Sequence, residues 1–472
     1  MGQKLSAADT SSSEAPRELG HGLLKEFQFD EGWRNLNHGS YGTIPKAISQ
    51  KRREYLDRYE ARPDVFIRRD VATLVNESRA AVAQLVNAPL RDVVFVGNAT
   101  EGVNTVLRNL HWSPDGRDVI ISFGTIYDAM ARAEDFVVDY FKDKVVARDI
   151  LLTYPVEDDE ILRLFRETVR GIEAEGKRAR VAVFDVVSSN PGVVFPWEAM
   201  TAACRELGVL SLVDGAQGIG MVHLDLKTTD PDFFVSNCHK WLHVPRGCAV
   251  FYVPERNHKL IPSSLATSRG YVPQEGGRAL RTQPLPDYGE VGHLAFNFGW
   301  VGTRDDSPYM CVKDAIAWRR DVLGGEERIL AYLWDLNKRG IRHVAGVLGT
   351  EYLDNKTGTM TNCGMGNVAL PLWVAKEEED AEGEGERVTE GGGQGLVLSR
   401  EEANAAFNFM AKALMDEYKT FVALYVRWDR FWVRISAQVY LEMEDYEWLA
   451  KVLKELAERV VKGEFRGQKQ QE

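Results

Sequence analysis

The sequence lacks any apolar run near the roughly 18 residues that a membrane-spanning helix needs, and its 472 residues include only five cysteines. We therefore expect no membrane span. The N-terminal stretch MGQKLSAADTSSSEAPRELG also lacks the apolar segment of a secretory signal. A sparse, odd set of cysteines is typical of reduced thiols inside cells, so we expect a cytoplasmic protein.

Excess basic charge is also missing, because 58 Lys and Arg face 70 Asp and Glu and give a formal net charge of -12. This balance argues against general binding to nucleic acid or to anionic membranes, while a local basic pocket for an anionic ligand stays possible. The segment CHKWLH offers Cys238, His239 and His243, but no second ligand cluster follows. We therefore expect no metal site, since structural zinc takes four ligands.

The order of apolar runs indicates the fold class. Residues 44–63 and 71–87 have helical spacing. Between residues 92 and 254, short β-branched or aromatic runs end in polar and Gly-rich residues and alternate with helical stretches. This alternation predicts an α/β domain with a mostly parallel, buried sheet, whose strand ends bind ligands. A chain of this length is expected to form more than one domain.

The sequence after residue 311 has a different pattern, with two helical stretches followed by alternating strands and helix. We predict a large domain over 46–311 and a smaller α+β domain over 312–472. Residues 375–395 are acidic and Gly-rich, which predicts a mobile surface insertion. Residues 1–19 are polar and small, and we expect them to be disordered.

One strand end carries a lysine that needs an explanation. Lys240 follows the apolar run FFVS, and Asp214 ends the preceding run LSLV, with Gln217 just beyond. Neighbouring parallel strands would aim both side chains at one crevice. A buried ammonium is costly to desolvate, so this pair is either a buried salt bridge or part of a reactive site.

Further strand ends favour the reactive site. Thr100 and nearby amides in GNATEGVN, at the start of a predicted helix, could bind a phosphate. Tyr127 could stack on a flat ligand, and Arg434 lies in an apolar strand where its planar guanidinium suits a carboxylate. Pyridoxal 5'-phosphate (PLP) needs such a set, since it forms a Schiff base with a lysine and its ring nitrogen needs an anionic partner.

At this point the motifs VDGAQGIG, SNCHKWLHVPRG, NATEGVN, VGTRD and VRISAQVY resemble the class V aminotransferase family, within fold type I of the PLP enzymes. The segment NLNHGSYGTIP resembles its isopenicillin N epimerase-like branch, and within that branch the chain looks most like the fungal hercynylcysteine sulfoxide lyases of ergothioneine synthesis. The resemblance covers roughly residues 30 to 450 and implies a large seven-stranded domain, a small C-terminal domain and an N-terminal arm over 20–45 that lines the active site.

The resemblance also implies roles for individual residues. Lys240 would hold PLP, Asp214 would pair with its ring nitrogen and Gln217 would bind its ring hydroxyl. The other implied positions are Thr100, the Glu101 amide and His239 at the phosphate, Tyr127 stacking on the ring, Thr303 reaching the phosphate of a second subunit, Arg434 at the substrate carboxylate, and Asn37 and His38 at the substrate entrance. Because Thr303 would contribute to the active site of a second subunit, the resemblance implies a homodimer with shared active sites. The implied substrate is a small amino acid.

The activity implied is carbon–sulfur β-lyase chemistry, in which hercynylcysteine sulfoxide is cleaved to a sulfenate or thiol product, pyruvate and ammonia. Tyr127 is the candidate acid at sulfur. The alternatives are a cysteine desulfurase, which would need Cys363 as a nucleophile rather than as a buried core residue, an amino-acid epimerase, and a PLP-binding module without turnover. Pyruvate, as opposed to alanine, would identify the lyase.

Recognition of the substrate side chain stays open at this level. Trp428, Phe431 and Trp432 precede Arg434, and they could either contact a trimethylated group or belong to the core. Arg68 and Arg69 could face the pocket or cover the surface.

Overall fold

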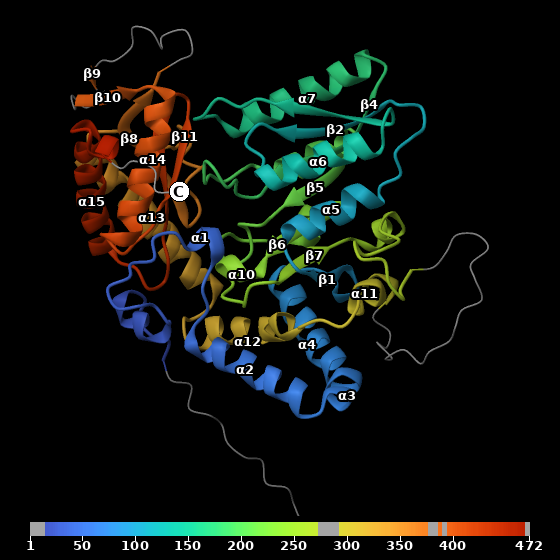
Figure 1. Cartoon of the computed structure of the whole chain (residues 1–472). Coiled ribbons are helices and arrows are strands. Elements are labelled where there is room, and N and C mark those ends of the chain that lie inside the picture. The colour runs from blue at the N-terminus through green and yellow to red at the C-terminus, as the bar shows by residue number, and fades with distance from the viewer. Residues whose placement is uncertain (1–14, 272–291, 376–385, 389–393, 468–472) are drawn as a thin grey trace, which may run out of the picture.

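The computed structural model describes residues 15–271, 292–375, 386–388 and 394–467. A seven-stranded sheet and a five-stranded sheet lie side by side, and helix α1 of the N-terminal arm lies near α10 between them (Figure 1). The helices are α1 His38–Tyr41, α2 Lys46–Ala61, α3 Pro63–Val65, α4 Val71–Leu85, α5 Ala99–Asn109, α6 Asp128–Tyr140, α7 Asp158–Ala174, α8 Trp197–Glu206, α9 Leu226–Thr229, α10 Cys238–Trp241, α11 Gly292–Gly299, α12 Ser307–Asp321, α13 Glu326–Leu348, α14 Arg400–Asp416 and α15 Met443–Val461.

The larger sheet has the order β1-β7-β6-β5-β4-β2-β3, and β7 is its one antiparallel strand among the described residues. Its strands are β1 Val93–Val96, β2 Asp118–Phe123, β3 Val145–Ile150, β4 Arg178–Asp185, β5 Leu210–Asp214, β6 Phe233–Asn237 and β7 Ala249–Tyr252. The predicted α/β fold with a mostly parallel sheet is confirmed. The strands that end in Asp214 and Asn237 are neighbours, as their shared crevice requires.

Both faces of this sheet are buried, which explains its continuous apolar runs. Alternate residues of β4 contribute to two separate cores: Val181 and Val183 pack with α5 and α6, whereas Ala182 and Phe184 pack with α7 and α8. The second of these cores continues into the C-terminal part of the chain. The two sheets are therefore joined by packed side chains.

The smaller sheet has the order β11-β12-β8-β10-β9. Its strands are β8 Met365–Val374, β9 Glu386–Val388, β10 Gln394–Leu398, β11 Ala423–Arg427 and β12 Arg430–Ser436, and α13 and α15 pack together over it. Helix α12 spans the boundary that we expected at residue 312, and Tyr55 of α2 donates a hydrogen bond to Asp314 of α12.

Three local differences from the sequence analysis have physical causes. The sequence analysis did not single out strand β3, because it is an edge strand whose middle residues are exposed or half-exposed, so its apolar run is limited to Val145, Val146 and Ala147. Part of the expected insertion over 375–395 forms β9 and β10, while 376–385 and 389–393 lie outside the described residues. Of the expected disordered tail, 1–14 lies outside them too, whereas the Arg17 amide donates to the Val322 oxygen at 2.9 Å.

Candidate active site

A pocket with about 690 Å³ of empty space lies at the carboxyl ends of three parallel strands. Asp185 ends β4, Asp214 ends β5, and Lys240 follows β6 in the short helix α10. Segments distant in sequence complete its wall with Ser40, Tyr41, Thr100, Tyr127 and His239. This edge is the usual ligand site of a parallel α/β sheet.

The Lys240 side chain enters this pocket without a protein partner. Within the described part of the chain, its ammonium has no hydrogen bond and no ion pair. Burial, and after it the charge of Arg434, lower the pKa of Lys240, Asp214 and Asp185 act in the opposite direction, and the resulting pKa is about 8. A large share of this lysine is therefore a neutral amine near pH 8, which is the form that attacks a carbonyl or accepts a proton.

Lys240 is held in place from its backbone side by His38. The His38 Nε2 donates to the Lys240 carbonyl oxygen at 2.6 Å, and its Nδ1 accepts from the Tyr440 hydroxyl at 3.0 Å. Burial lowers the pKa of His38 to about 3, so it stays neutral. We expected His38 at the substrate entrance; in the structure it is buried beside α10, where its hydrogen-bond partners lie, and it does not line the pocket.

Two carboxyl groups meet on the floor of the pocket. Asp185 and Asp214 lie directly opposite each other in the β4–β5 pair, and both are buried. Burial raises the pKa of both groups, and the charge of Asp214 raises that of Asp185 further. An amide hydrogen bond from Ala216 at 2.8 Å favours the charged form of Asp214. Asp185 therefore protonates first and Asp214 keeps the negative charge beside Lys240.

The sequence analysis did not single out Asp185. A signal existed, since it ends the apolar run VAVF, but that β4 lies next to β5 is a property of the sheet order. Gln217 was singled out and does line the pocket, yet its amide also links the backbone at Gly39 to the side chain of Trp241. Its Nε2 donates to the Gly39 oxygen at 2.8 Å, and its Oε1 accepts from Trp241 Nε1 at 2.7 Å.

The start of α5 faces the pocket with Asn98, Ala99 and Thr100. Asn98 caps this helix, because its side chain accepts from the Glu101 amide at 2.9 Å, and the Glu101 carboxylate accepts from the Gly97 amide at 2.7 Å. The Glu101 amide, which we expected at the phosphate, is bonded to the capping side chain of Asn98 in this structure. Thr100 retains a position at the helix N-terminus, which favours anions.

His239 lines the same end of the pocket. Its Nδ1 lies 3.1 Å from the Cys248 carbonyl oxygen, to which it must donate, and burial lowers its pKa to about 4. Its other ring nitrogen faces no protein partner among the described residues. An anion at this nitrogen would favour a second proton there.

Tyr127 directly precedes α6, with 49% of its surface exposed. It lines the pocket, so both a flat ligand and a leaving group could contact it. Thr303 lies in an exposed turn outside the lining, so this chain alone does not bring it to the pocket. Arg68 pairs with Asp64 at the surface, and Arg69 does not line the pocket either.

Arg434 is a buried guanidinium without a carboxylate partner within the described residues. Its Nη1 donates to the Ser189 carbonyl oxygen at 2.8 Å, and its Nη2 donates to Ser40 Oγ at 2.8 Å and Asn37 Oδ1 at 3.2 Å. Its Nε is buried and has no partner. Burial lowers the pKa of Arg434 to about 10. Asn37 thus acts here by holding Arg434, and the unpaired positive charge suits an anionic ligand.

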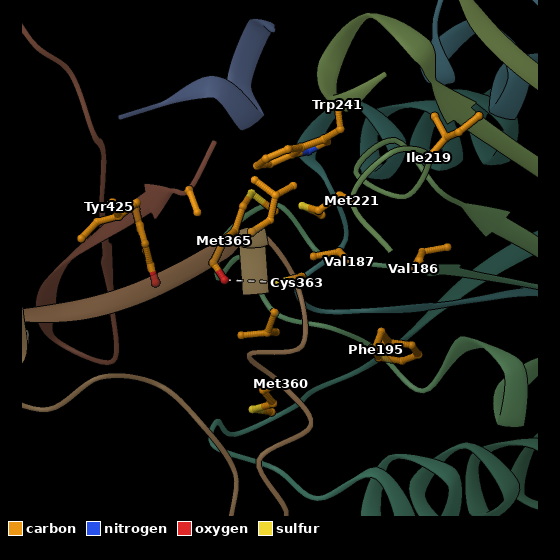
Figure 2. Close-up of a cluster of buried hydrophobic side chains, with 14 of the residues drawn as sticks. Val186, Val187, Phe195, Ile219, Met221, Trp241, Met360, Cys363, Met365 and Tyr425 are labelled. Carbon is orange, nitrogen blue, oxygen red and sulfur yellow. Dashed lines mark hydrogen bonds between the residues drawn. The ribbon is translucent and has the colours of Figure 1, made fainter. Parts of the chain in front are cut away.

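None of the five cysteines reaches the pocket surface. All are buried, and all lie in the described part of the chain. Cys363 lies in an apolar cluster with Met360, Met365 and Trp241, where its thiol donates to the Met365 oxygen at 3.2 Å (Figure 2). Burial raises the pKa of Cys363 to about 12, so it is an unreactive thiol. Phe431 and Trp432 are buried, whereas Trp428 is partly exposed.

The described residues contain no group of three metal-ligating side chains. Across these same residues, no helix combines the length and apolarity required to cross a bilayer.

Comparisons with known proteins agree with this geometry. Residues 40–269 match the family Aminotransferase class-V. The chain is 34% identical to the L-cysteine desulfhydrase-like protein lolT2 of Epichloe uncinata, over 95% of this chain and 96% of that protein. It is 28% identical to the hercynylcysteine sulfoxide lyase of Schizosaccharomyces pombe, over 92% and 97%. The fold matches the cystine C–S lyase C-DES with a TM-score of 0.67, at 17% identity, over 92% of this chain and 98% of that one.

Proposed function

Since the chain belongs to the class V aminotransferase family of PLP enzymes, we propose that it is a carbon–sulfur lyase that eliminates the sulfur substituent of a cysteine conjugate. Hercynylcysteine sulfoxide is the proposed substrate. The observation that carries the proposal is a pocket lined by Lys240 and the buried Asp214, with the buried Arg434 directly behind its lining residues Ser40 and Ser189. Among the described residues neither Lys240 nor Arg434 has a carboxylate partner, and all five thiols are buried.

The donor set of the pocket fits PLP. Lys240 would form the covalent link, and Asp214 would pair with the ring nitrogen, because it is the member of the carboxyl pair that keeps its charge. Thr100 and His239 would bind the phosphate at the start of α5. When bound, PLP supplies a carbonyl for attachment and a ring that delocalises the electrons released at the substrate α-carbon.

Arg434 would bind the substrate carboxylate through its Nη donors, which in this structure contact Ser189, Ser40 and Asn37 beside the pocket, whereas its Nε is buried. The substrate α-carbon would then lie between Arg434 and Lys240. The positive charge of Arg434 contributes to the lowered pKa of Lys240. A neutral Lys240 amine accepts the α-proton, so the basic group is on the same side chain that first held the cofactor. Its pKa of about 8 is close to the value that proton transfer at neutral pH requires.

At the sulfur end, elimination breaks the Cβ–S bond and the sulfur group leaves with its bonding electrons. From a sulfoxide substrate, the leaving group is a sulfenate. It takes up one proton, and Tyr127 is the proposed donor of that proton. Water then hydrolyses the remaining three-carbon fragment to pyruvate and ammonium. A further reduction of the sulfenic acid to a thiol would need an external reductant. No step uses a protein thiol, in keeping with five buried cysteines.

An L-cysteine desulfhydrase is the second candidate, because the Epichloe relative with that description is 34% identical. Both reactions release pyruvate and differ in the size of the sulfur substituent. Comparing kcat/KM for L-cysteine with that for hercynylcysteine sulfoxide separates them. A preference for L-cysteine would support the desulfhydrase.

We further propose that the enzyme is a cytoplasmic homodimer in which Thr303 of one copy completes the phosphate site of the other. The exposed position of Thr303 supports this arrangement. Sedimentation velocity of the holoenzyme tests it, and a monomer with full activity would contradict it.

Product analysis tests the lyase proposal against cysteine desulfurase chemistry. We expect pyruvate from the wild type, and we expect Cys363→Ser to keep most of the activity. Tyr127→Phe should lose roughly 100-fold or more in kcat, the usual contribution of a general acid. Tyr140→Phe, an exposed tyrosine on the same helix, is the matched control. Release of alanine, with activity abolished in a folded Cys363→Ser variant, would favour the desulfurase.

A further inference from the structure

A second arginine without a carboxylate partner lies near the pocket. Arg427 ends β11, is half-buried, and forms no ion pair with any described residue. Both of its Nη atoms donate only to the Gly124 carbonyl oxygen, at 3.3 and 3.4 Å. Gly124 lies three residues before Tyr127, so Arg427 reaches the loop that carries one wall of the pocket. These long hydrogen bonds to one neutral oxygen leave most of its donors available.

An aromatic group follows directly in the chain. Trp428 and Asp429 form the turn between β11 and β12 with φ values of 51° and 56°, a conformation that tryptophan seldom adopts. This turn leaves the indole 36% exposed. It contacts Tyr154, with ring centroids 5.9 Å apart, and Trp432, at 5.6 Å. The Trp432 Nε1 is buried without a partner, which adds an unused donor.

Arg427 and Arg434 lie along the same side of one strand pair. Arg427 is opposite Arg430 in the β11–β12 register, and Arg434 is four residues further along β12, which corresponds to roughly 13 Å. Tyr425 lies between them, and both positive charges act on its pKa. Tyr154 likewise interacts with Arg427 and with Asp185 of the pocket floor. The register therefore places the two arginines on one side of the hairpin, with Tyr425 between them.

On this basis we propose that Arg427 and Trp428 form a second substrate subsite, which binds a flat ring bearing its own carboxylate at the far end of the cysteine conjugate. This inference rests on the proposed function, because Arg434 must hold the amino-acid carboxylate for Arg427 to bind the distal one. The subsite selects elongated conjugates with two acidic groups, and it disfavours L-cysteine, which cannot span the distance. A proposed substrate with a betaine carboxylate on an imidazole side chain has this form.

The experiment compares three compounds: hercynylcysteine sulfoxide, its analogue with hydrogen in place of the distal carboxylate, and L-cysteine. The holoenzyme variants are Arg427→Gln, Arg427→Lys and Trp428→Leu, and Arg132→Gln, an exposed arginine of α6, is the matched control. Steady-state kcat/KM is measured for each pair. Dissociation constants are measured by calorimetry in a Lys240→Ala background, which separates binding from turnover.

We expect Arg427→Gln to weaken binding and lower kcat/KM for the acidic conjugate by roughly 10- to 100-fold, the usual size of a charge-assisted hydrogen bond. The carboxylate-free analogue and L-cysteine should be nearly unaffected, and Arg427→Lys should recover part of the loss. Trp428→Leu should weaken both ring-bearing compounds alike by roughly 2- to 10-fold and spare L-cysteine.

Equal losses for all three compounds would overturn the subsite and make Arg427 a structural tether between β11 and the Gly124 loop. A wild type that does not discriminate between the acidic conjugate and its analogue would overturn it as well. If no conjugate yields pyruvate, the proposed function fails separately. In that case the calorimetric constants still decide: selective weakening of the acidic conjugate by Arg427→Gln supports the subsite, and unchanged binding refutes it.

Discussion

Replacing the buried Arg434 by methionine separates its role in function from its role in stability. Methionine has a similar unbranched shape but no charge, so the packing around β12 changes little. The guanidinium is only 2% exposed, and its contacts are with the neutral acceptors Ser189, Ser40 and Asn37. Within the described residues Arg434 has no carboxylate partner, so removing its charge leaves no opposite charge unpaired.

The expected magnitudes follow from these contacts. A pKa lowered from 12.5 to about 10 means that burying the charged form costs about 3 kcal/mol. This cost is constant at every pH below about 10, since the group stays protonated there in both the folded and the unfolded states. Loss of the hydrogen bonds to neutral acceptors, about 1 kcal/mol each, offsets the gain in Arg434→Met. The substrate-free variant should therefore melt within a few degrees of the wild type.

Substrate turnover should respond quite differently. Two charge-assisted bonds to a carboxylate contribute at least about 3 kcal/mol, so kcat/KM should fall more than 100-fold. Arg434→Lys keeps the charge without the planar fork and should give an intermediate loss. The assay combines melting curves of the substrate-free enzyme with initial rates. A large drop in melting temperature with normal kcat/KM in the folded fraction would refute the reasoning.

Three other predictions follow from the buried titratable groups. The rate at which the apoenzyme captures PLP should rise with pH and level off above about 8, because the neutral Lys240 amine is the reacting form; a flat profile between pH 6 and 9 would contradict this. Asp214→Asn should lower kcat by about 100-fold, about 3 kcal/mol, whereas Asp185→Asn should lose much less, since Asp185 is the protonated member of the pair; equal losses would contradict the assignment. Burial raises the pKa of Glu134 to about 8, so the folded protein binds this proton more tightly than the unfolded chain does. The wild type therefore loses stability as the pH rises from about 4.5 to 8. The stability of Glu134→Gln relative to the wild type should therefore increase by a few kcal/mol across that window and stay constant above it. Melting temperature against pH measures this, with the exposed Glu173→Gln as control.

Much of the site could be predicted from the sequence because it depends on strand ends. Asp214 and Lys240 each follow an apolar run, and parallel strands bring their carboxyl ends to one edge of the sheet. Arg434 was identified for a similar reason, since a cation in an apolar strand needs an anion. The alternation of runs and helices likewise predicted the α/β fold, because both faces of such a sheet are buried.

What the sequence could not supply are the partners of polar groups that lie far apart along the chain. The hydrogen bond from His38 joins it to the oxygen of Lys240, 202 residues away, and Gln217 contacts Gly39 across 178 residues. A side chain that looks free in the sequence can be fully occupied in the fold. His38 is therefore a support for α10, and Asn37 is a support for Arg434.

The amino-acid order alone thus determined which residues are candidates for the chemistry, since hydrophobic periodicity and strand-end chemistry are local properties. The tertiary structure decided which of those groups remain unpaired and face the same space. Asp185 joined Asp214 only through the order of the strands, and Arg427 came to the pocket loop only because the C-terminal hairpin packs on Gly124. Such pairings depend on the balance of burial and hydrogen bonding over the whole chain, which no single segment contains.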